Sequence, residues 1–111
     1  MRRTSFKNSK TGWFIGSFPE ALFSVNFEVG IRSWKANTSE LIHYHKLADE
    51  INLILEGSCL FIFGKHVEKC QKNDIIIVER NEKCKFVALT DTKLLIIKTN
   101  SDQHDKYITE I

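Results

Sequence analysis

The stretch HYHKLADEINLILEG, residues 43–57, is the most informative part of this chain, because it holds two histidines, a glutamate and a glycine at a defined spacing. Side chains two positions apart on a β-strand point to the same face, so His43 and His45 are expected to point the same way. Glu50 opens the next predicted strand and can return a carboxylate to that place. Two imidazoles and a carboxylate on one face suit a divalent metal ion. Gly57 lies where the following hairpin has to turn.

Outward from this stretch, the pattern predicts short strands separated by frequent turns. The expected strands cover residues 23–34, 41–45, 51–56, 59–63, 75–78, 84–89 and 92–98. The only segments that suggest a helix are a short stretch near Ala21 and the C-terminal tail, and neither is well capped. Many short strands with turn signals between them predict an all-β sandwich or barrel, with no helix longer than about three turns.

The composition excludes several classes of protein. A length of 111 residues predicts a single domain. A net charge of +2, without a helix-turn-helix or a run of lysine and arginine, argues against a nucleic-acid partner. The longest apolar runs, residues 75–78 and 94–97, are far too short to cross a bilayer, so no membrane partner is expected.

The N-terminus and the cysteines bear on localisation. Residues 1–5 are not followed by an apolar core, so no signal peptide is expected. Cys59, Cys70 and Cys84 are an odd number without the spacing of a disulfide framework. Reduced thiols in a cytoplasmic protein are the simpler interpretation.

The complete spacing His-x-His-x4-Glu-x6-Gly resembles the first signature of the cupin superfamily, and the resemblance runs from Val29 to about Asn100. It implies a small double-stranded β-helix, an all-β barrel of the jelly-roll type. Residues 29–100 would form this barrel, residues 1–28 an N-terminal extension with strands, and residues 101–111 a C-terminal tail. Asn37 replaces the glycine that usually opens the signature, which is a mild exchange because both residues tolerate left-handed turns.

The second cupin signature is less well preserved. Its usual form is Gly-x5-Pro-x-Gly-x2-His-x3-Asn, and the matching residues here are Asn73, Glu79, Asn81, Cys84 and Ala88. The strand inside this signature still fits the family. The third metal-binding histidine, however, is replaced by Cys84, so the resemblance implies the fold without the usual three-histidine site.

Three interpretations of Cys84 follow. Its thiolate completes a four-ligand set with His43, His45 and Glu50, which suits Zn²⁺. Alternatively, the two histidines and the glutamate hold the metal alone and leave positions open for water, substrate or oxygen. In the third interpretation Cys84 is an inert core residue and the metal site has decayed. His43 and His45 would then line a cavity and form hydrogen bonds with a polar ligand.

Neighbouring residues receive simpler assignments. Tyr44 lies between the histidines and is expected to face away from them. Asn52 shares the face of Glu50, where it can contact the ligand or support the metal ligands. Trp34 and Phe86 are able to stack on a ligand, but core packing is the default for both.

The resemblance therefore implies a small cupin that binds a polar small molecule in its barrel. The molecule would bind through a divalent metal ion (Zn, Fe, Mn or Ni) on His43, His45 and Glu50, and the protein would be a binding protein or an enzyme acting on a sugar or another small metabolite. No catalytic residue is assigned. The alternatives are a metal-free ligand-binding or regulatory module and a metal-free sugar-nucleotide isomerase. The apolar segment 13–18 further predicts a homodimer joined through this segment or through an edge strand.

Overall fold

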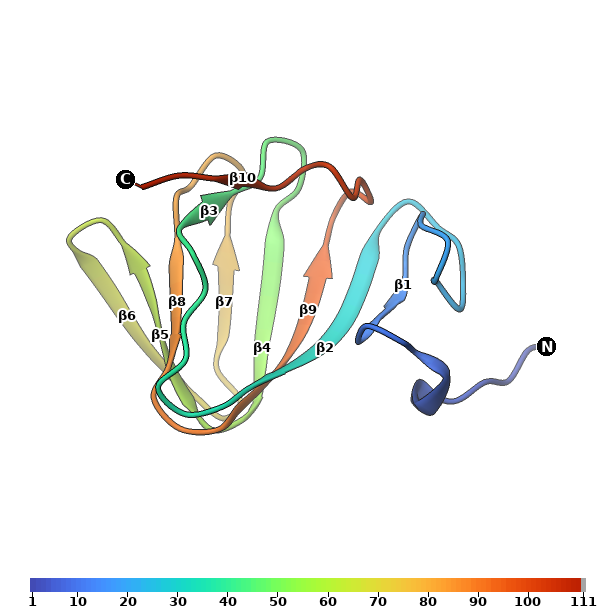
Figure 1. The fold of residues 1–111 in the computed structure, drawn as a ribbon, viewed down its shortest axis with the longest axis horizontal. Helices are drawn as coiled ribbons and strands as arrows, with labels where there is room; N and C mark the ends of the chain where they lie inside the picture. The colour runs from blue at the N-terminus through green and yellow to red at the C-terminus, as the bar shows by residue number, and fades with distance from the viewer. Residues whose placement is uncertain (111) are drawn as a thin grey trace.

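The computed structural model describes residues 1–110, which form an antiparallel β-barrel without an α-helix (Figure 1). The strands are β1 (Trp13–Ile15), β2 (Glu28–Trp34), β3 (His43–Tyr44), β4 (Glu50–Glu56), β5 (Ser58–Phe63), β6 (His66–Gln71), β7 (Ile75–Val78), β8 (Lys85–Ala88), β9 (Thr92–Lys98) and β10 (Tyr107–Ile108). The single helical turn in this part of the chain is a 3₁₀ turn at Phe6–Asn8. Residues 1–110 thus contain no helix with the length and apolarity needed to cross a membrane.

The strands are arranged in two main sheets and one short ribbon. The larger sheet has the order β1-β2-β9-β4-β7, the smaller sheet has the order β6-β5-β8, and β3 pairs with β10. The ribbon β3–β10 crosses one end of the barrel, at the top of Figure 1. This end contains the two histidines of the sequence motif.

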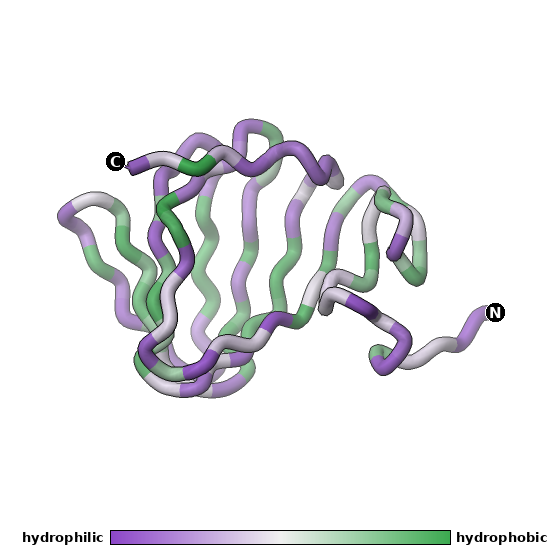
Figure 2. The backbone as a smooth tube through the Cα atoms, in the orientation of Figure 1, coloured by the Kyte–Doolittle hydropathy of each residue, from purple (hydrophilic) through white to green (hydrophobic). Residues whose placement is uncertain are grey.

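The core lies between the two sheets because each strand turns alternate side chains inward. On β4 the side chains of Asn52 and Ile54 are buried, and on β9 those of Leu94 and Ile96 are buried. Apolar side chains from both sheets form one cluster, which includes Phe61 of the smaller sheet. Figure 2 shows the matching alternation of hydrophobic and hydrophilic residues along the strands. The predicted all-β barrel is therefore confirmed.

Three asparagines adopt backbone conformations that normally favour glycine. Asn37, Asn73 and Asn81 have φ angles of 67°, 77° and 69°, and among residues 1–110 they are the non-glycine residues with positive φ. All three stand where the cupin signatures usually have glycine. Asparagine tolerates the left-handed region better than most residues, so the turns survive the exchange.

Two expectations about segments need correction. The strand predicted for residues 23–34 begins only at Glu28, and Phe23 and Phe27 remain 48% and 40% exposed. Neither the stretch near Ala21 nor the described part of the C-terminal tail is helical. The tail instead supplies β10, which places Tyr107 opposite Tyr44.

Candidate metal centre

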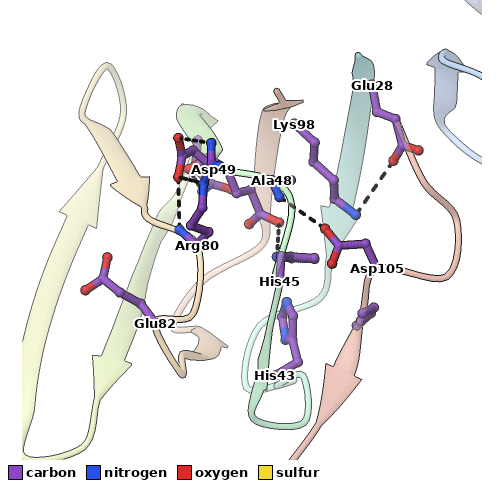
Figure 3. A network of polar contacts seen from close by, with 12 residues as sticks. Glu28, His43, His45, Ala48, Asp49, Arg80, Glu82, Lys98 and Asp105 are labelled. Atoms are coloured by element: carbon purple, nitrogen blue, oxygen red, sulfur yellow. Dashed lines mark hydrogen bonds and ion pairs between the residues drawn. The ribbon is translucent and has the colours of Figure 1, made fainter. Parts of the chain in front are cut away.

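His43, His45 and Glu50 converge at one end of the barrel, as their spacing predicts. One ligand atom from each lies within 4.8 Å of the others. The two imidazole rings are 5.2 Å apart between centroids and nearly perpendicular, and His45 Nδ1 lies 3.8 Å from Glu50 Oε2. Figure 3 shows the histidines one above the other along the same segment. This set of donors is able to hold a divalent cation.

The position of His43 is set by backbone and side-chain hydrogen bonds. Its backbone N–H donates to Cys84 O (3.1 Å) and its carbonyl accepts from Cys84 N (3.0 Å), which joins β3 to the chain just before β8. The ring Nδ1–H donates to the carbonyl of Leu41 at 3.1 Å. In a neutral imidazole this bond leaves the lone pair on Nε2, which is then available to a metal ion.

The imidazole of His45 is neutral at pH 7, and one of its ring nitrogens has no hydrogen-bond partner. Burial is the main reason that the pKa of His45 falls to about 4, and the positive charge of Lys98 lowers it further. Its Nε2 atom is buried without a hydrogen-bond partner, and so is Oδ1 of Asn52. Such atoms are rare in folded proteins because an unpaired buried polar group is costly. Both can offer electron pairs to a cation, so the residues present fit a metal ion.

The free space around these residues consists of two cavity levels that share lining residues. An inner cavity of about 20 Å³ is bounded by His43, His45, Glu50, Asn52 and Cys84, among others. That volume holds roughly one water-sized occupant, which suits an ion or a water molecule better than an organic ligand. An outer cavity of about 140 Å³ shares both histidines and Glu50 and lies at the same end of the barrel, which we call the barrel mouth. Of these two levels, only the outer cavity therefore has room for an organic ligand.

Asp105, which sequence reasoning missed, organises the loop between the histidines and Glu50. Its buried carboxylate accepts hydrogen bonds from the backbone N–H groups of Lys46, Leu47 and Ala48, at distances between 2.8 and 3.2 Å. Figure 3 shows this contact beside the ion pair of Asp49 with Arg80. Asp105 lies 57 to 59 residues away along the chain, and no spacing links it to the motif.

Cys84 lines the inner cavity, but its sulfur is not one of the three atoms within 4.8 Å. The thiol donates weakly to the carbonyl of Lys85 at 3.8 Å. Burial, followed by the negative charge of Glu50, raises the pKa of Cys84 to about 12. Its role as a metal ligand therefore stays a prediction.

The other predicted residues also have definite places. Asn52 lines the inner cavity, as do Trp34 and Phe86, whose rings pack together with centroids 4.7 Å apart. Tyr44 instead stacks on Tyr107 at 5.3 Å. It lines neither cavity level, as expected for a residue that faces away from the histidines.

Neither a protein family model nor a curated protein matches the sequence. Solved structures do match. A cupin-2 domain protein from Shewanella frigidimarina aligns with a TM-score of 0.60 and 18% identity, over 65% of this chain and 69% of its own. A cupin superfamily protein from Desulfitobacterium hafniense aligns with a TM-score of 0.62 and 19% identity, over 69% of each chain.

A third match is the salicylate 1,2-dioxygenase of Pseudoaminobacter salicylatoxidans, as a variant in complex with gentisate. It aligns with a TM-score of 0.66 and 14% identity over 72% of this chain, which spans 22% of the enzyme. At these identities the alignments establish the fold. The chain has the cupin fold, and the resemblance seen in its sequence is confirmed.

Proposed function

We propose that this protein binds a divalent metal ion on His43, His45 and Glu50 and uses it to hold a polar small molecule at the barrel mouth. The observation that carries the proposal is the convergence of three donor atoms within 4.8 Å around a cavity of about 20 Å³. The unpartnered Nε2 of His45 and Oδ1 of Asn52 add to it.

Several of the protein's own groups support this role. The hydrogen bond from His43 Nδ1–H to Leu41 fixes one tautomer, and the low pKa of His45 keeps the second ring neutral. Glu50 contributes negative charge, and the backbone bonds to Asp105 hold the loop that joins it to His45. A bound ion would supply Lewis acidity toward an oxygen atom of the ligand.

The donor set narrows the choice of metal. Two imidazoles and one carboxylate suit Zn, Fe, Mn or Ni, and they leave coordination positions open for a ligand. The dioxygenase among the structural matches has a small molecule, gentisate, in its complex. The present chain is proposed to bind its own ligand at the end of the barrel that contains His43 and His45.

Metal content measured by elemental analysis on protein purified without a histidine tag tests the proposal. We expect about one ion per chain, and we expect His43→Ala and His45→Ala to lose most of it. His66→Ala and His104→Ala are matched controls, because these two histidines lie outside both cavity levels.

A negative result has a clear meaning. If the protein is loaded in turn with Zn, Fe, Mn and Ni and retains none after desalting, the metal proposal is wrong. The metal-free ligand-binding module then becomes the better interpretation, with His43 and His45 as hydrogen-bonding groups. Equal metal loss in the control variants would also contradict the proposal.

A further inference from the structure

We propose that the ligand held at the barrel mouth is a small carboxylate and that the guanidinium of Arg32 is its main anchor. The inference rests on the proposed function in one respect, since it places the ligand beside the metal centre. It is carried by the walls and charges of the outer cavity.

The outer cavity combines positive charge with flat aromatic walls. Arg32, Lys98 and Lys106 line it together with Trp13 and Trp34, beside the histidines of the metal centre. Tryptophan faces suit the apolar body of a ligand, and the cations suit an anionic end. The volume of about 140 Å³ limits the ligand to a small molecule.

Of these three cations, only Arg32 is without an ion pair. Lys98 Nζ lies 3.8 Å from Glu28 Oε1, and Lys106 Nζ lies 3.5 Å from Glu40 Oε2. Arg32 instead lies over the ring of Trp34, 5.8 Å from its centroid, and within residues 1–110 its guanidinium has no ion pair or hydrogen bond. Stacking uses only the face of a guanidinium, so its in-plane N–H groups remain free to donate.

The strand pattern of β2 explains why Arg32 is in the cavity. Alternate residues of this strand face the barrel, and Arg32 and Trp34 follow the buried Glu28 and Gly30 on that side. A β-carbon on Gly30 would lie 2.6 Å from the ring of Trp13. Glycine at this position therefore lets the Trp13 ring pack against β2 and form a wall beside Arg32.

The charges in the cavity favour a monoanion with two oxygen atoms. A guanidinium presents a planar fork of donors that matches a carboxylate with two parallel hydrogen bonds. Glu40 and Glu50 line the same cavity and would repel a phosphate dianion more strongly than a monoanion. The second end of the ligand would reach toward the histidines.

Tryptophan fluorescence offers a direct readout, because both tryptophans of the chain line this cavity. Zinc-loaded protein would be titrated with benzoate and isobutyrate, with benzamide and isobutyramide as their neutral analogues, and with inorganic phosphate. We expect saturable binding of the carboxylates, with at least about tenfold weaker binding of the amides and of phosphate. Equal affinity for acid and amide, or tighter binding of phosphate, would overturn the inference.

Variants separate Arg32 from the general field of positive charge. We expect Arg32→Gln to weaken carboxylate binding at least about tenfold with little change for the amides, and Arg32→Lys to give an intermediate loss. Lys35→Gln is the matched control, because Lys35 is exposed, lies next to Trp34 and does not line the cavity. Equal losses for Arg32→Gln and Lys35→Gln would contradict an anchoring role for Arg32.

The metal proposal and the carboxylate inference fail in different ways. If zinc binds stoichiometrically but acids and amides bind alike, only the carboxylate inference is wrong. If the double variant His43→Ala/His45→Ala binds no zinc but still prefers benzoate to benzamide through Arg32, the carboxylate site stands. The same preference in a wild-type protein that holds no metal would refute the metal proposal alone.

Discussion

At the scale of single residues, Cys84 is the position that most distinguishes this barrel from the usual cupin signature. It faces the inner cavity from the bridge opposite His43, where most cupins would present a third histidine. Burial keeps its thiol protonated, with a pKa near 12, and its sulfur lies outside the group of three donor atoms. Cys84 thus lies beside the candidate metal centre, and its role as a ligand stays a prediction.

We predict that Cys84→His raises zinc affinity by about tenfold or more, because it adds a neutral nitrogen ligand beside the existing three. Cys84→Ser should change zinc affinity little and cost about 1–3 kcal/mol of stability, because it buries a hydroxyl. Competition with a zinc chelator measures the affinity, and urea unfolding measures the stability. A large loss of affinity in Cys84→Ser would instead make Cys84 a ligand.

A second residue-scale prediction concerns Gly57, which joins β4 to β5 with φ at 86°. A β-carbon there would collide with the carbonyl oxygen of Asp91, whereas one on Gly64, with φ at 61°, would meet open space. Gly64→Ala should cost about 1–2 kcal/mol from backbone strain alone. Gly57→Ala should cost at least about 2 kcal/mol more because of the collision. Similar midpoints of urea unfolding for the two variants would contradict this account.

At the scale of elements, the C-terminal segment reaches the candidate metal centre in two ways. It pairs with β3 through β10, and its Asp105 binds the backbone of the loop between β3 and β4. Nearby, Asn100 donates to the carbonyl of Leu47 at 2.6 Å. Asn100 and the tail thus support the part of the chain that joins His45 to Glu50.

We predict that Asp105→Ala lowers stability by about 2–4 kcal/mol, because it leaves backbone N–H groups without their acceptor. It should also weaken zinc binding about tenfold, although no ligand has been changed. Asp105→Asn keeps one of the two oxygen acceptors and should give a smaller effect. Asp102→Ala is the control, since Asp102 is exposed in the same segment. Zinc binding equal to wild type in Asp105→Ala would remove this segment from the site.

At the scale of the whole molecule, the two edge strands of the larger sheet, β1 and β7, differ in how well their apolar side chains are buried. The sequence predicted a homodimer joined through residues 13–18 or an edge strand. Trp13 of that segment already packs against the core of its own chain. At the opposite edge, β7 leaves Ile75 and Ile77 64% and 54% exposed. An exposed apolar edge strand is the kind of surface that pairs with a second copy.

We therefore predict a homodimer joined at the β7 edge. Light scattering at high micromolar concentration should give twice the chain mass of 12.9 kDa. The double variant Ile75→Lys/Ile77→Lys should be monomeric, because it places like charges at the edge. Leu41→Lys is the control and should stay dimeric, because Leu41 is 70% exposed and does not belong to β7. A monomeric wild-type protein would contradict the prediction.

The sequence by itself determined the features that depend on local spacing. Alternation of apolar residues predicts strands, and the interval between His43 and His45 places both on one face, because side-chain direction follows from neighbouring backbone angles. Local alternation also misled, since residues 23–27 have a strand-like pattern but do not belong to β2. A strand exists only where a partner accepts its hydrogen bonds, and local sequence does not reveal the partner.

Only the tertiary structure decided which distant groups meet the motif. Asp105 reaches the loop after His45, Trp13 and Arg32 line the mouth above the histidines, and the C-terminal tail pairs with β3. None of these residues has a characteristic spacing from residues 43–57, because the contacts form across sheets whose order differs from the chain order. Long-range pairing and burial fix such contacts. The motif therefore predicts a metal site, whereas the packed barrel determines the cavity beside it and the charges that line that cavity.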